Sequence, residues 1–287
     1  MATNLTTIVS SKTQTVEITR GKPTVIVGER INPTGRKKLL SALKDGDFEI
    51  VRKDALAQVN AGAKIIDVNA GVPGADEKAM LLQMITEIQE VTDMPLCFDT
   101  ADDKVLEAAL SVYEGKALIN SVNGEEEKLA SVLPLVKEHD ASVIALCMDD
   151  NGIPPSPEDR LKVAGKMIGR AEKLGISQDR LIIDPLALTM GSDHNAGRIA
   201  IETIKLVVEE FGVNITMGAS NISFGMPDRP SINATFLAMA ILAGLTCPIT
   251  NPLENEISIA IKAADLVMGS DQFGMNWIKS YRARSQE

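Results

Sequence analysis

Short apolar runs recur along the chain, separated by longer stretches in which apolar residues return every three or four positions. Runs of the first kind are typical of buried parallel strands, and stretches of the second kind are typical of amphipathic helices. The apolar runs are TVIVGER from Thr24, KIIDVNA from Lys64, PLCFDT from Pro95, KALINSV from Lys116, ASVIALCMD from Ala141, RLIIDPL from Arg180, ITMGASN from Ile215 and CPITNP from Cys247. The pattern therefore predicts eight strands that alternate with helices.

The spacing of these runs indicates the architecture. They lie on average about 32 residues apart, which is the length of a strand plus a crossover helix. Strands joined in this way pair in parallel, and eight of them predict a (β/α)8 TIM barrel of the α/β class. An open doubly wound sheet is the alternative, although it usually contains fewer strands. We expect a single domain over residues 1–287, with the barrel in 24–268 and a polar N-terminal extension, 1–20, that lies on the barrel bottom or is disordered.

The stretches between the runs support this alternation. Residues 125–138 and 159–174 carry apolar side chains at helical spacing, with charged side chains on the opposite face. Gly62 and Gly175 closely follow helical patterns, where a left-handed C-terminal cap is expected. The segment after Asp271 predicts a further helix at the end of the chain.

Composition narrows the classes of function. Hydrophobic residues make up 45% of the chain and charged residues 24%, which excludes a disordered or fibrous protein. Acidic residues outnumber basic ones by 39 to 29, and only 3% of residues are aromatic. A net charge of −10 with so few stacking side chains argues against nucleic acid and anionic membranes as partners.

Cysteine usage and the lack of targeting signals predict a cytoplasmic protein. Cys97, Cys147 and Cys247 are widely spaced in apolar runs and odd in number, as is typical of reduced core thiols. The first twenty residues lack the basic start and apolar stretch of a secretory signal. The longest apolar segment, 236–245, is shorter than the roughly 20 residues that span a bilayer. We expect no membrane segment.

Side chains that carry oxygen gather where the predicted strands end. In a TIM barrel the site lies at the carboxyl ends of the strands, so these residues are the first candidates. They are Asp67, Asn69, Asp99, Asn120, Asp184 and Asn221, with Glu29, Asn32, Asp149 and Asn251 at the remaining ends. The alternative for each is a helix N-cap, in which the side chain accepts a hydrogen bond from a free backbone amide.

The two-residue period of a strand favours an inward direction for several of them. In IIDVN, Asp67 and Asn69 share one face, whereas Ile66 and Val68 occupy the other. The surrounding helices require the apolar face, so the acid is expected to point into the barrel. Asp184 precedes a proline, which disfavours helical geometry and hence a cap at this position.

An inward ring of carboxylates and amides suits two kinds of ligand. Hard divalent cations take oxygen ligands, but amides are weaker ligands, and the two histidines, His139 and His194, lack a zinc-binding spacing. A pterin presents a ring N–H beside an amino group, a donor pair that a carboxylate accepts in bidentate fashion, while amides suit its mixed edges. The mixture of Asp and Asn favours a pterin, and we expect no protein-bound metal.

Motifs from most of the chain carry a family resemblance. They are GERIN at 28–32, IIDVN at 65–69, LCFDT at 96–100, INS at 119–121, IDPL at 183–186, SN at 220–221 and DRPSINATFLAMAILAGL at 228–245. In this order the sequence resembles the methyltetrahydrofolate:corrinoid protein methyltransferases. This family shares a pterin-binding barrel with cobalamin-dependent methionine synthase and dihydropteroate synthase.

The resemblance implies a function in one-carbon metabolism. A methyl group would pass, in either direction, between N5 of tetrahydrofolate and the cobalt of a corrinoid (cobalamin) carried by a separate corrinoid protein. It also implies a homodimer. By position, Asp99, Asn120 and Asp184 would hold the pterin ring, and Asp67 and Asn69 would line the same pocket.

The resemblance gives the catalytic role to Asn221. As the C–N bond breaks, N5 must gain a proton or a hydrogen bond, and a positioned amide can stabilise the developing protonated amine by accepting from it. Arg229 is a candidate contact for the folate tail. Ile222, Phe224 and Met226 are candidate contacts for a corrinoid at an open mouth, with ordinary packing as the alternative.

Two other functions stay open. A dihydropteroate synthase would use the same pocket and expel pyrophosphate, but the last two strand ends, GASNISFG and CPITNPLENE, contain no Lys or Arg to receive a diphosphate. A non-catalytic barrel that binds a pterin or a corrinoid partner would bind folate and transfer nothing.

Overall fold

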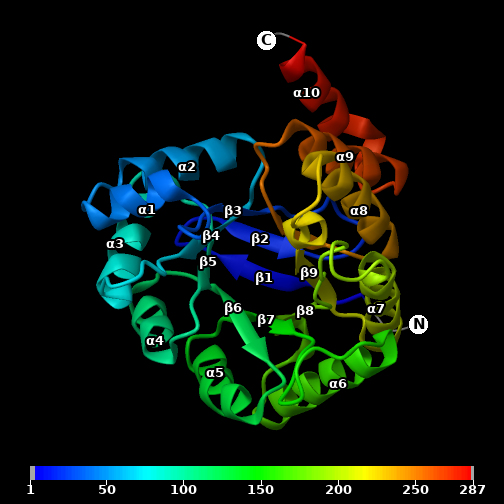
Figure 1. Ribbon diagram of the computed structural model, residues 1–287, viewed down its shortest axis with the longest axis horizontal. Helices are drawn as coiled ribbons and strands as arrows, with labels where there is room; N and C mark the ends of the chain where they lie inside the picture. The colour runs from blue at the N-terminus through cyan, green and yellow to red at the C-terminus, as the bar shows by residue number, and fades with distance from the viewer. Residues whose placement is uncertain (1–3, 286–287) are drawn as a thin grey trace.

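All eight predicted strands pair in parallel and close into a barrel (Figure 1). This computed structural model describes residues 4–285. The barrel strands are β3 (Val27–Ile31), β4 (Ile65–Asn69), β5 (Leu96–Asp99), β6 (Leu118–Asn123), β7 (Ser142–Leu146), β8 (Leu181–Asp184), β9 (Asn214–Gly218) and β10 (Cys247–Thr250). They neighbour one another in chain order, and β10 pairs with β3 to close the ring. The TIM barrel prediction is confirmed, and the open sheet is wrong.

Helices form the outer ring around these strands, as Figure 1 shows. They are α1 (Lys37–Lys44), α2 (Glu49–Asn60), α3 (Glu77–Gln89), α4 (Asp103–Val112), α5 (Glu126–Glu138), α6 (Pro157–Lys173), α7 (Ala196–Phe211), α8 (Arg229–Ala243) and α9 (Asn255–Val267). A last helix, α10 (Met275–Arg284), projects from the ring. The predicted helices at 125–138, 159–174 and after Asp271 are therefore confirmed. Gly62 and Gly175 both have positive φ, as expected after a helix end.

Two layers of core result from the alternation along each strand. Ile65 faces the barrel interior, together with Cys97, Leu118 and Ile182 from other strands. Ile66 and Val68 instead pack outward in the layer between the strands and the helices. The inward direction predicted for the face of β4 that carries Asp67 agrees with this division.

The N-terminal extension forms a hairpin that closes the bottom of the barrel. Strands β1 (Thr7–Ser10) and β2 (Thr15–Ile18) pair antiparallel, and Val9 and Ile18 are fully buried in the interior core. The amide of Ser10 donates to the carbonyl of Lys116 just before β6, which fixes the hairpin at the amino ends of the strands. Of the two alternatives for residues 1–20, the position on the barrel bottom is correct for residues 4–20, and residues 1–3 lie outside the described part.

The three cysteines are buried free thiols, as predicted. Their pKa values are all raised by burial, which keeps them protonated. No helix within residues 4–285 combines the length and the apolar character needed to cross a membrane.

Candidate functional site

Adjacent strands bring four of the predicted site residues together at the carboxyl rim of the barrel. Asn69, Asp99 and Asn120 occupy neighbouring register positions on β4, β5 and β6, and Asp67 lies two residues before Asn69 on the same face. The Asn69 amide donates to the Asp99 carboxylate at 2.9 Å, and the Asn120 amide donates to Asp67 at 3.1 Å. Each carboxylate is therefore held in place by an amide.

Burial makes both of these carboxylates unusually basic. It is the largest cause of the raised pKa of Asp67, and the nearby Asp99 raises that pKa further. Burial also raises the pKa of Asp99, against the hydrogen bond from Asn69. Two carboxylates that share a desolvated rim favour a ligand that brings N–H donors to them.

Asp184 ends β8 and is also buried. Its carboxylate accepts a hydrogen bond from the Leu186 amide at 2.7 Å. Burial nevertheless dominates and raises the pKa of Asp184 to about 7, although backbone amides and the nearby Arg160 act in the opposite direction. A carboxyl group with such a pKa can change its protonation state when a ligand binds.

Arg160 supports the loop that follows Asp184, and the sequence interpretation missed it. Its side chain extends from α6, is only 2% exposed and donates to the carbonyls of Pro185 and Leu186 at 2.8 Å and of Pro154 at 2.9 Å. A signal was present, because Arg160 stands three residues before Val163 on the apolar face of the predicted helix. A charged residue in an apolar stripe indicates a buried polar role.

Asn221 lies in the short 3-10 helix η2 (Ala219–Ser223) just after β9. Its side-chain nitrogen would lie 3.0 Å from a Cβ atom at Gly218, so the glycine lets the amide fold back against the strand end. The preceding Ser220 donates a hydrogen bond to the Glu29 carboxylate of β3 at 2.8 Å. This contact ties the segment that carries Asn221 to a strand two positions away around the barrel, since β10 lies between them.

Glu29 and Glu254 form a second group of acids near this segment. Burial is the main cause of the raised pKa of Glu29, and Glu254 adds to it. Glu254 accepts from the Asn251 amide at 3.2 Å. The sequence analysis placed Glu29 and Asn251 at strand ends without giving them a role. The sequence does not show that these two strand ends are neighbours, because β10 pairs with β3 only in the closed barrel.

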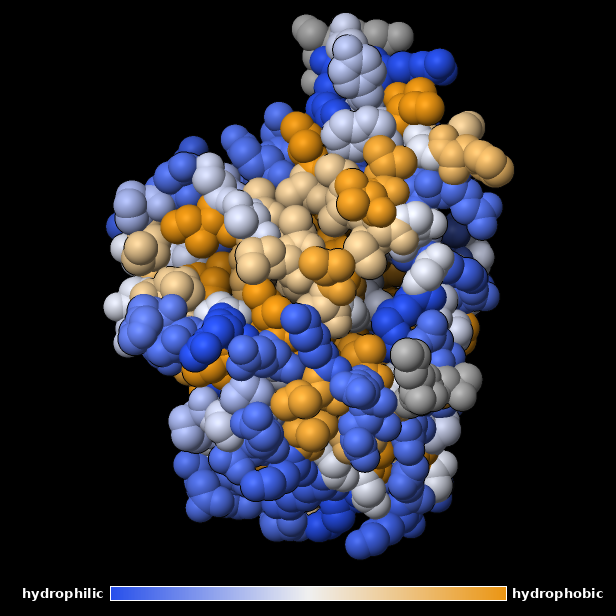
Figure 2. Space-filling view, turned by 90° about the vertical axis from the view of Figure 1, so that its right-hand side faces the viewer, coloured by the Kyte–Doolittle hydropathy of each residue, from blue (hydrophilic) through white to orange (hydrophobic). Residues whose placement is uncertain are grey.

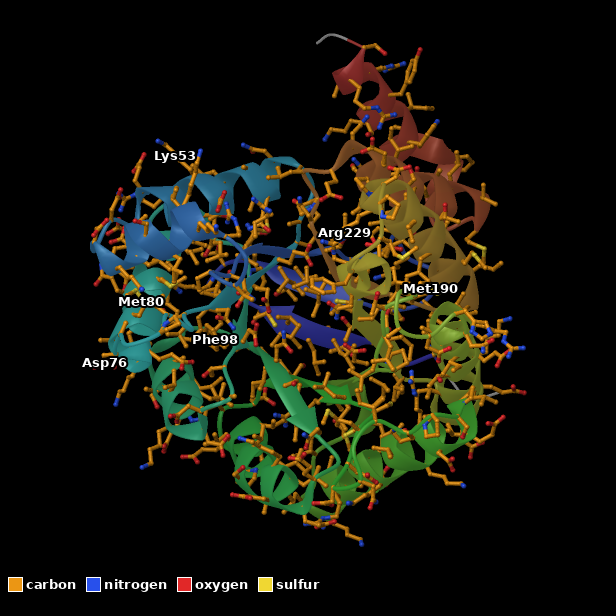
Figure 3. The ribbon with its side chains drawn as sticks, in the orientation of Figure 1. Lys53, Asp76, Met80, Phe98, Met190 and Arg229 are labelled. Carbon is orange, nitrogen blue, oxygen red and sulfur yellow. The ribbon has the colours of Figure 1, made fainter. Side chains whose placement is uncertain are left out.

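Arg229 is exposed at the start of α8, where it holds the same loop. Its guanidinium donates to the Ser223 hydroxyl at 3.0 Å and to the Ser220 carbonyl at 2.8 Å, and it lies over the Phe224 ring. Figure 3 shows Arg229 at the barrel opening, with Met190 further out toward α7. A role in binding the folate tail stays a prediction.

For Ile222, one of the three candidate corrinoid contacts, the alternative of ordinary packing holds. Ile222 is buried, and its carbonyl accepts a hydrogen bond from the Met190 amide at 2.9 Å. Its side chain belongs to the core between the strands and the helices, whereas its neighbour Asn221 is exposed. Phe224 is 67% exposed and remains available.

Other strand-end residues serve the backbone instead. The Asn32 side chain accepts from the amide of Thr34, and the Asp149 side chain accepts from the amide of Asn151, each at 2.9 Å. These two side chains make local turn contacts, which are neither inward-facing site contacts nor the helix N-caps given as the alternative. Asn120 also differs slightly from its prediction, because β6 continues past it after a register shift.

A hollow of about 170 Å³ opens beside Asp99 and Asn120, with Thr100 and Lys128 also in its wall. Lys128 is itself paired with Asp103 at 3.0 Å. Within the described residues, no three or more His, Cys, Asp or Glu side chains are arranged to hold a metal ion.

Comparisons with known proteins identify the family. The model of the pterin binding enzyme family matches residues 28–251. A methylcorrinoid:tetrahydrofolate methyltransferase from Eubacterium limosum is 31% identical over 266 residues, which cover 90% of this chain and 96% of the relative. Methionine synthase from Mycobacterium tuberculosis is 29% identical over 256 residues, or 85% of this chain but only 22% of that much longer protein.

Solved structures show the same fold. The 7,8-dihydropteroate synthase of Vibrio fischeri superposes with a TM-score of 0.67 at 19% identity, covering 91% of this chain and 98% of the other. A Yersinia pestis DHPS with a pterine-sulfa conjugate superposes with a TM-score of 0.66 at 15% identity, with the same coverage. At these identities the likeness concerns the fold alone.

Proposed function

Because the chain belongs to the pterin binding enzyme family, we propose that it transfers a methyl group between N5 of tetrahydrofolate and the cobalt of a corrinoid. The chain is a methyltransferase, similar over nearly its whole length to the methylcorrinoid:tetrahydrofolate methyltransferase of Eubacterium limosum. The observation that carries the proposal is the paired set of acids and amides at the ends of β4, β5 and β6. In this proposal residues 1–287 form a single pterin-binding domain, with the barrel in residues 24–268.

The pterin is held by the rim acids and amides in this proposal. Asp99 and Asp184 accept from the ring N–H and the amino group, because a carboxylate matches two adjacent donors. Asn120 pairs with a mixed edge of the ring, since an amide both donates and accepts. Asp67 and Asn69 line the pocket. Asn69 orients Asp99 and Asp67 orients Asn120 through the hydrogen bonds described above.

Asn221 supports the chemistry at N5. In one direction the methyl group leaves cobalt for N5, cobalt keeps the bonding electron pair and the N5 proton departs. In the other direction cobalt(I) attacks the methyl carbon, and N5 must gain a proton as the C–N bond breaks. The Asn221 carbonyl accepts a hydrogen bond from the protonated amine, and such a positioned group is commonly worth roughly 3 to 4 kcal/mol. Arg229 contacts the folate tail.

The proposal also covers the binding partners, the oligomeric state and the cellular location of the protein. A separate corrinoid protein brings the corrinoid to the mouth, where Phe224 is exposed. The chain works as a homodimer in the cytoplasm. The net charge of −10 is consistent with partners other than nucleic acid or anionic membranes.

A direct test follows the cobalt spectrum. The protein is incubated anaerobically with methylcobalamin and tetrahydrofolate, and separately with cob(I)alamin and methyltetrahydrofolate. We expect interconversion of methylcobalamin and cob(I)alamin in at least one direction, and a much slower change with Asn221→Ala. A protein that binds folate but changes neither spectrum, also when its corrinoid partner is supplied, is a binding barrel and not the proposed enzyme.

A further inference from the structure

Glu29 is an acid in the barrel mouth to which the proposed chemistry gives no role. It lies two residues after Val27 on β3, and Val27 belongs to the interior core, so the two-residue period of the strand directs Glu29 inward. Its negative charge helps to raise the pKa of Asp67, which places it near the pterin rim. Burial is the main cause of its own raised pKa. Because a desolvated carboxylate lowers the stability of the fold, an acid at this position needs a compensating contact.

An irregularity in β3 directs this side chain. The pairing of β3 with β4 shifts register between Gly28 and Ile31, and irregularities of this kind change the direction of the side chains within them. Gln58, fully buried on α2, fixes the irregular segment, because its side-chain oxygen accepts from the Arg30 amide at 2.8 Å. Gly28 makes room for Gln58, since a Cβ atom at this position would clash with the same oxygen. The direction of Glu29 therefore depends on backbone that is itself held in place.

The compensating contact of Glu29 is the hydroxyl of Ser220, which donates to the carboxylate at 2.8 Å. Ser220 directly precedes Asn221 in the short helix η2. Arg229 holds the same residue through its main chain, because the guanidinium donates to the Ser220 carbonyl at 2.8 Å and to the Ser223 hydroxyl at 3.0 Å. A carboxylate and a guanidinium thus fix Ser220 through two different groups.

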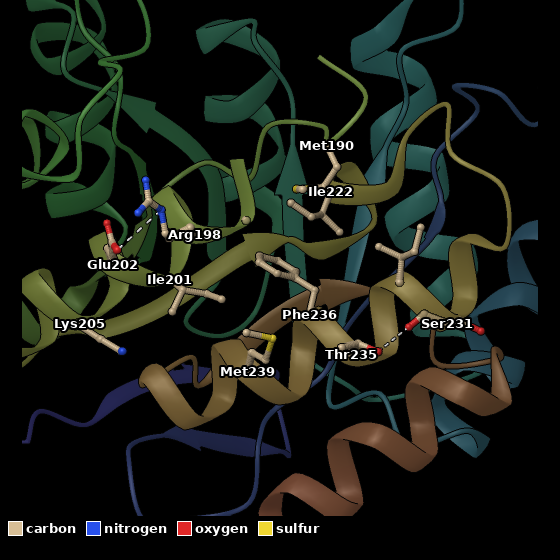
Figure 4. A pocket seen from close by; sticks show the side chains of 12 residues that line it. Met190, Arg198, Ile201, Glu202, Lys205, Ile222, Ser231, Thr235, Phe236 and Met239 are labelled. Carbon is tan, nitrogen blue, oxygen red and sulfur yellow. Dashed lines mark hydrogen bonds and ion pairs between the residues drawn. The ribbon is translucent and has the colours of Figure 1, made fainter. Parts of the chain in front are cut away.

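Packing holds the outer side of the same turn. Ile222 is buried, and Figure 4 shows it beside Met190 in the groove between α7 and α8. The Met190 amide also donates to the Ile222 carbonyl at 2.9 Å. Apolar side chains gather in the upper part of the face on which this groove opens (Figure 2). Asn221 is exposed between these two anchored neighbours, so the direction of its amide follows from the backbone that Ser220 and Ile222 hold.

We propose that Glu29 is a positioning residue for methyl transfer, whose carboxylate fixes, through the hydroxyl of Ser220, the turn that directs Asn221 toward N5. The inference rests on the proposed function and adds a residue to it. Glu29 acts on the reaction only through its neighbours in this turn. A displacement of about 1 Å of a group that acts in the transition state can lower the rate about a hundredfold. The exposed Asn221 side chain is open to such a displacement when its backbone is released.

Two other roles for Glu29 make different demands on the side chain. A proton donor to N5 needs an ionisable group, which glutamine lacks. A direct contact with the pterin contributes to folate affinity. The positioning role needs only an acceptor for the Ser220 hydroxyl, which the side-chain carbonyl of glutamine supplies. The variants Glu29→Gln and Glu29→Ala therefore distinguish the three roles.

The test measures single-turnover methyl transfer, equilibrium folate binding and backbone hydrogen exchange of residues 215–226 in the full-length protein. We expect Glu29→Ala and Ser220→Ala each to slow transfer at least about tenfold, with nearly unchanged folate affinity and faster exchange in the turn. Glu29→Gln should stay close to the wild type in all three measurements. Glu172→Ala is the matched control, because Glu172 also accepts a side-chain hydrogen bond, from Gln178 at 2.6 Å, but lies at the far end of α6.

A double-mutant cycle shows whether Glu29 acts through Asn221. In the Asn221→Ala background, Glu29→Ala should change the rate little further, because the side chain that it positions is absent. Losses that simply add overturn the proposal. It is also overturned by a loss of rate in Glu29→Gln as large as that in Glu29→Ala, or by a loss confined to folate affinity. Thermal melting verifies the fold of each variant, and Ser220→Ala decides the question if Glu29→Ala does not fold.

Hydrogen exchange separates this inference from the proposed function. A wild type that changes neither cobalt spectrum overturns the proposed function, and faster exchange of the turn in Glu29→Ala then still supports the contact that holds Asn221. An active wild type whose rate and turn exchange are the same in Glu29→Ala overturns the positioning role alone.

Discussion

The side-chain amide of Asn120 donates a hydrogen bond to the carboxylate of Asp67 at 3.1 Å, reaching across the intervening strand β5. Beside it, the Asn69 amide makes the same kind of bond to Asp99. Each carboxylate is therefore held in a fixed orientation and can still accept further hydrogen bonds. A pterin with two adjacent N–H donors would find acceptors already oriented, which lowers the cost of binding.

Replacing Asp99 by Ala should weaken folate binding by at least about 2 kcal/mol, or roughly thirtyfold, because the ring donors lose a charged acceptor. Titration calorimetry measures this. Asp102→Ala is the control, since Asp102 caps α4 by accepting from the Lys104 amide at 2.8 Å and lies outside the proposed pocket. The control should lose some stability and keep its affinity. Unchanged affinity in folded Asp99→Ala would remove this residue from the site.

Asn221→Ala should lower kcat about a hundredfold while changing folate affinity far less, because the amide acts mainly when charge develops at N5. Single-turnover kinetics and equilibrium folate binding separate the two effects. Asn151→Ala, in an exposed turn of another loop, serves as the control. Equal losses in rate and in affinity would contradict a role at N5.

The ligand-free protein should lose stability as the pH rises from about 4 to about 7. Burial raises the pKa of Asp184 to about 7, so between its unfolded value and pH 7 the native state holds a proton that the unfolded state has released. The contribution of Asp184 to stability therefore falls with increasing pH in this window, and the raised pKa values of Asp67, Asp99 and Glu29 give contributions of the same sign. Urea unfolding at several pH values measures the slope. Asp184→Asn, which stays neutral, should make the slope shallower, and an unchanged slope would mean that Asp184 is ionised throughout.

Ile18→Ala should destabilise the protein by about 3 kcal/mol, because Ile18 is fully buried where the N-terminal hairpin closes the barrel. Glu17→Ala, on the exposed face of the same strand, should stay within about 0.5 kcal/mol of the wild type. Urea unfolding compares the two. A small effect of Ile18→Ala would show that the hairpin adds little to the barrel core.

The sequence predicted the barrel and the inward acids because both follow from periodicity. The regular spacing of apolar runs indicates alternating strands and helices, and the two-residue period places Asp67 opposite Ile66. The hairpin was not predicted, because Thr7–Ser10 and Thr15–Ile18 are short polar-looking strands. Their apolar side chains are buried only through contact with the bottom of the barrel, which is formed by residues far away in the sequence.

Contacts between distant segments were also beyond prediction. The bond from Ser220 to Glu29 joins the seventh barrel strand to the first, and nothing in either local sequence indicates the other. Ile222 was expected at the mouth, because sequence position alone does not say which side of a short helical turn faces the core. The direction of each side chain in this turn is fixed only when the barrel closes and the turn packs against it.

Arg160→Met should destabilise the protein by about 3 kcal/mol, because it leaves the carbonyls of Pro154, Pro185 and Leu186 without their donors in a buried setting. Arg170→Met, on an exposed part of the same helix where the arginine pairs with Glu126, should cost less than about 1 kcal/mol. The loss of Arg160 should also raise the pKa of Asp184 further, since its positive charge acts against the effect of burial. Urea unfolding measures the first effect, and the pH at which folate affinity rises measures the second. Equal stabilities of the two variants would show that the buried guanidinium does not hold the loop after Asp184.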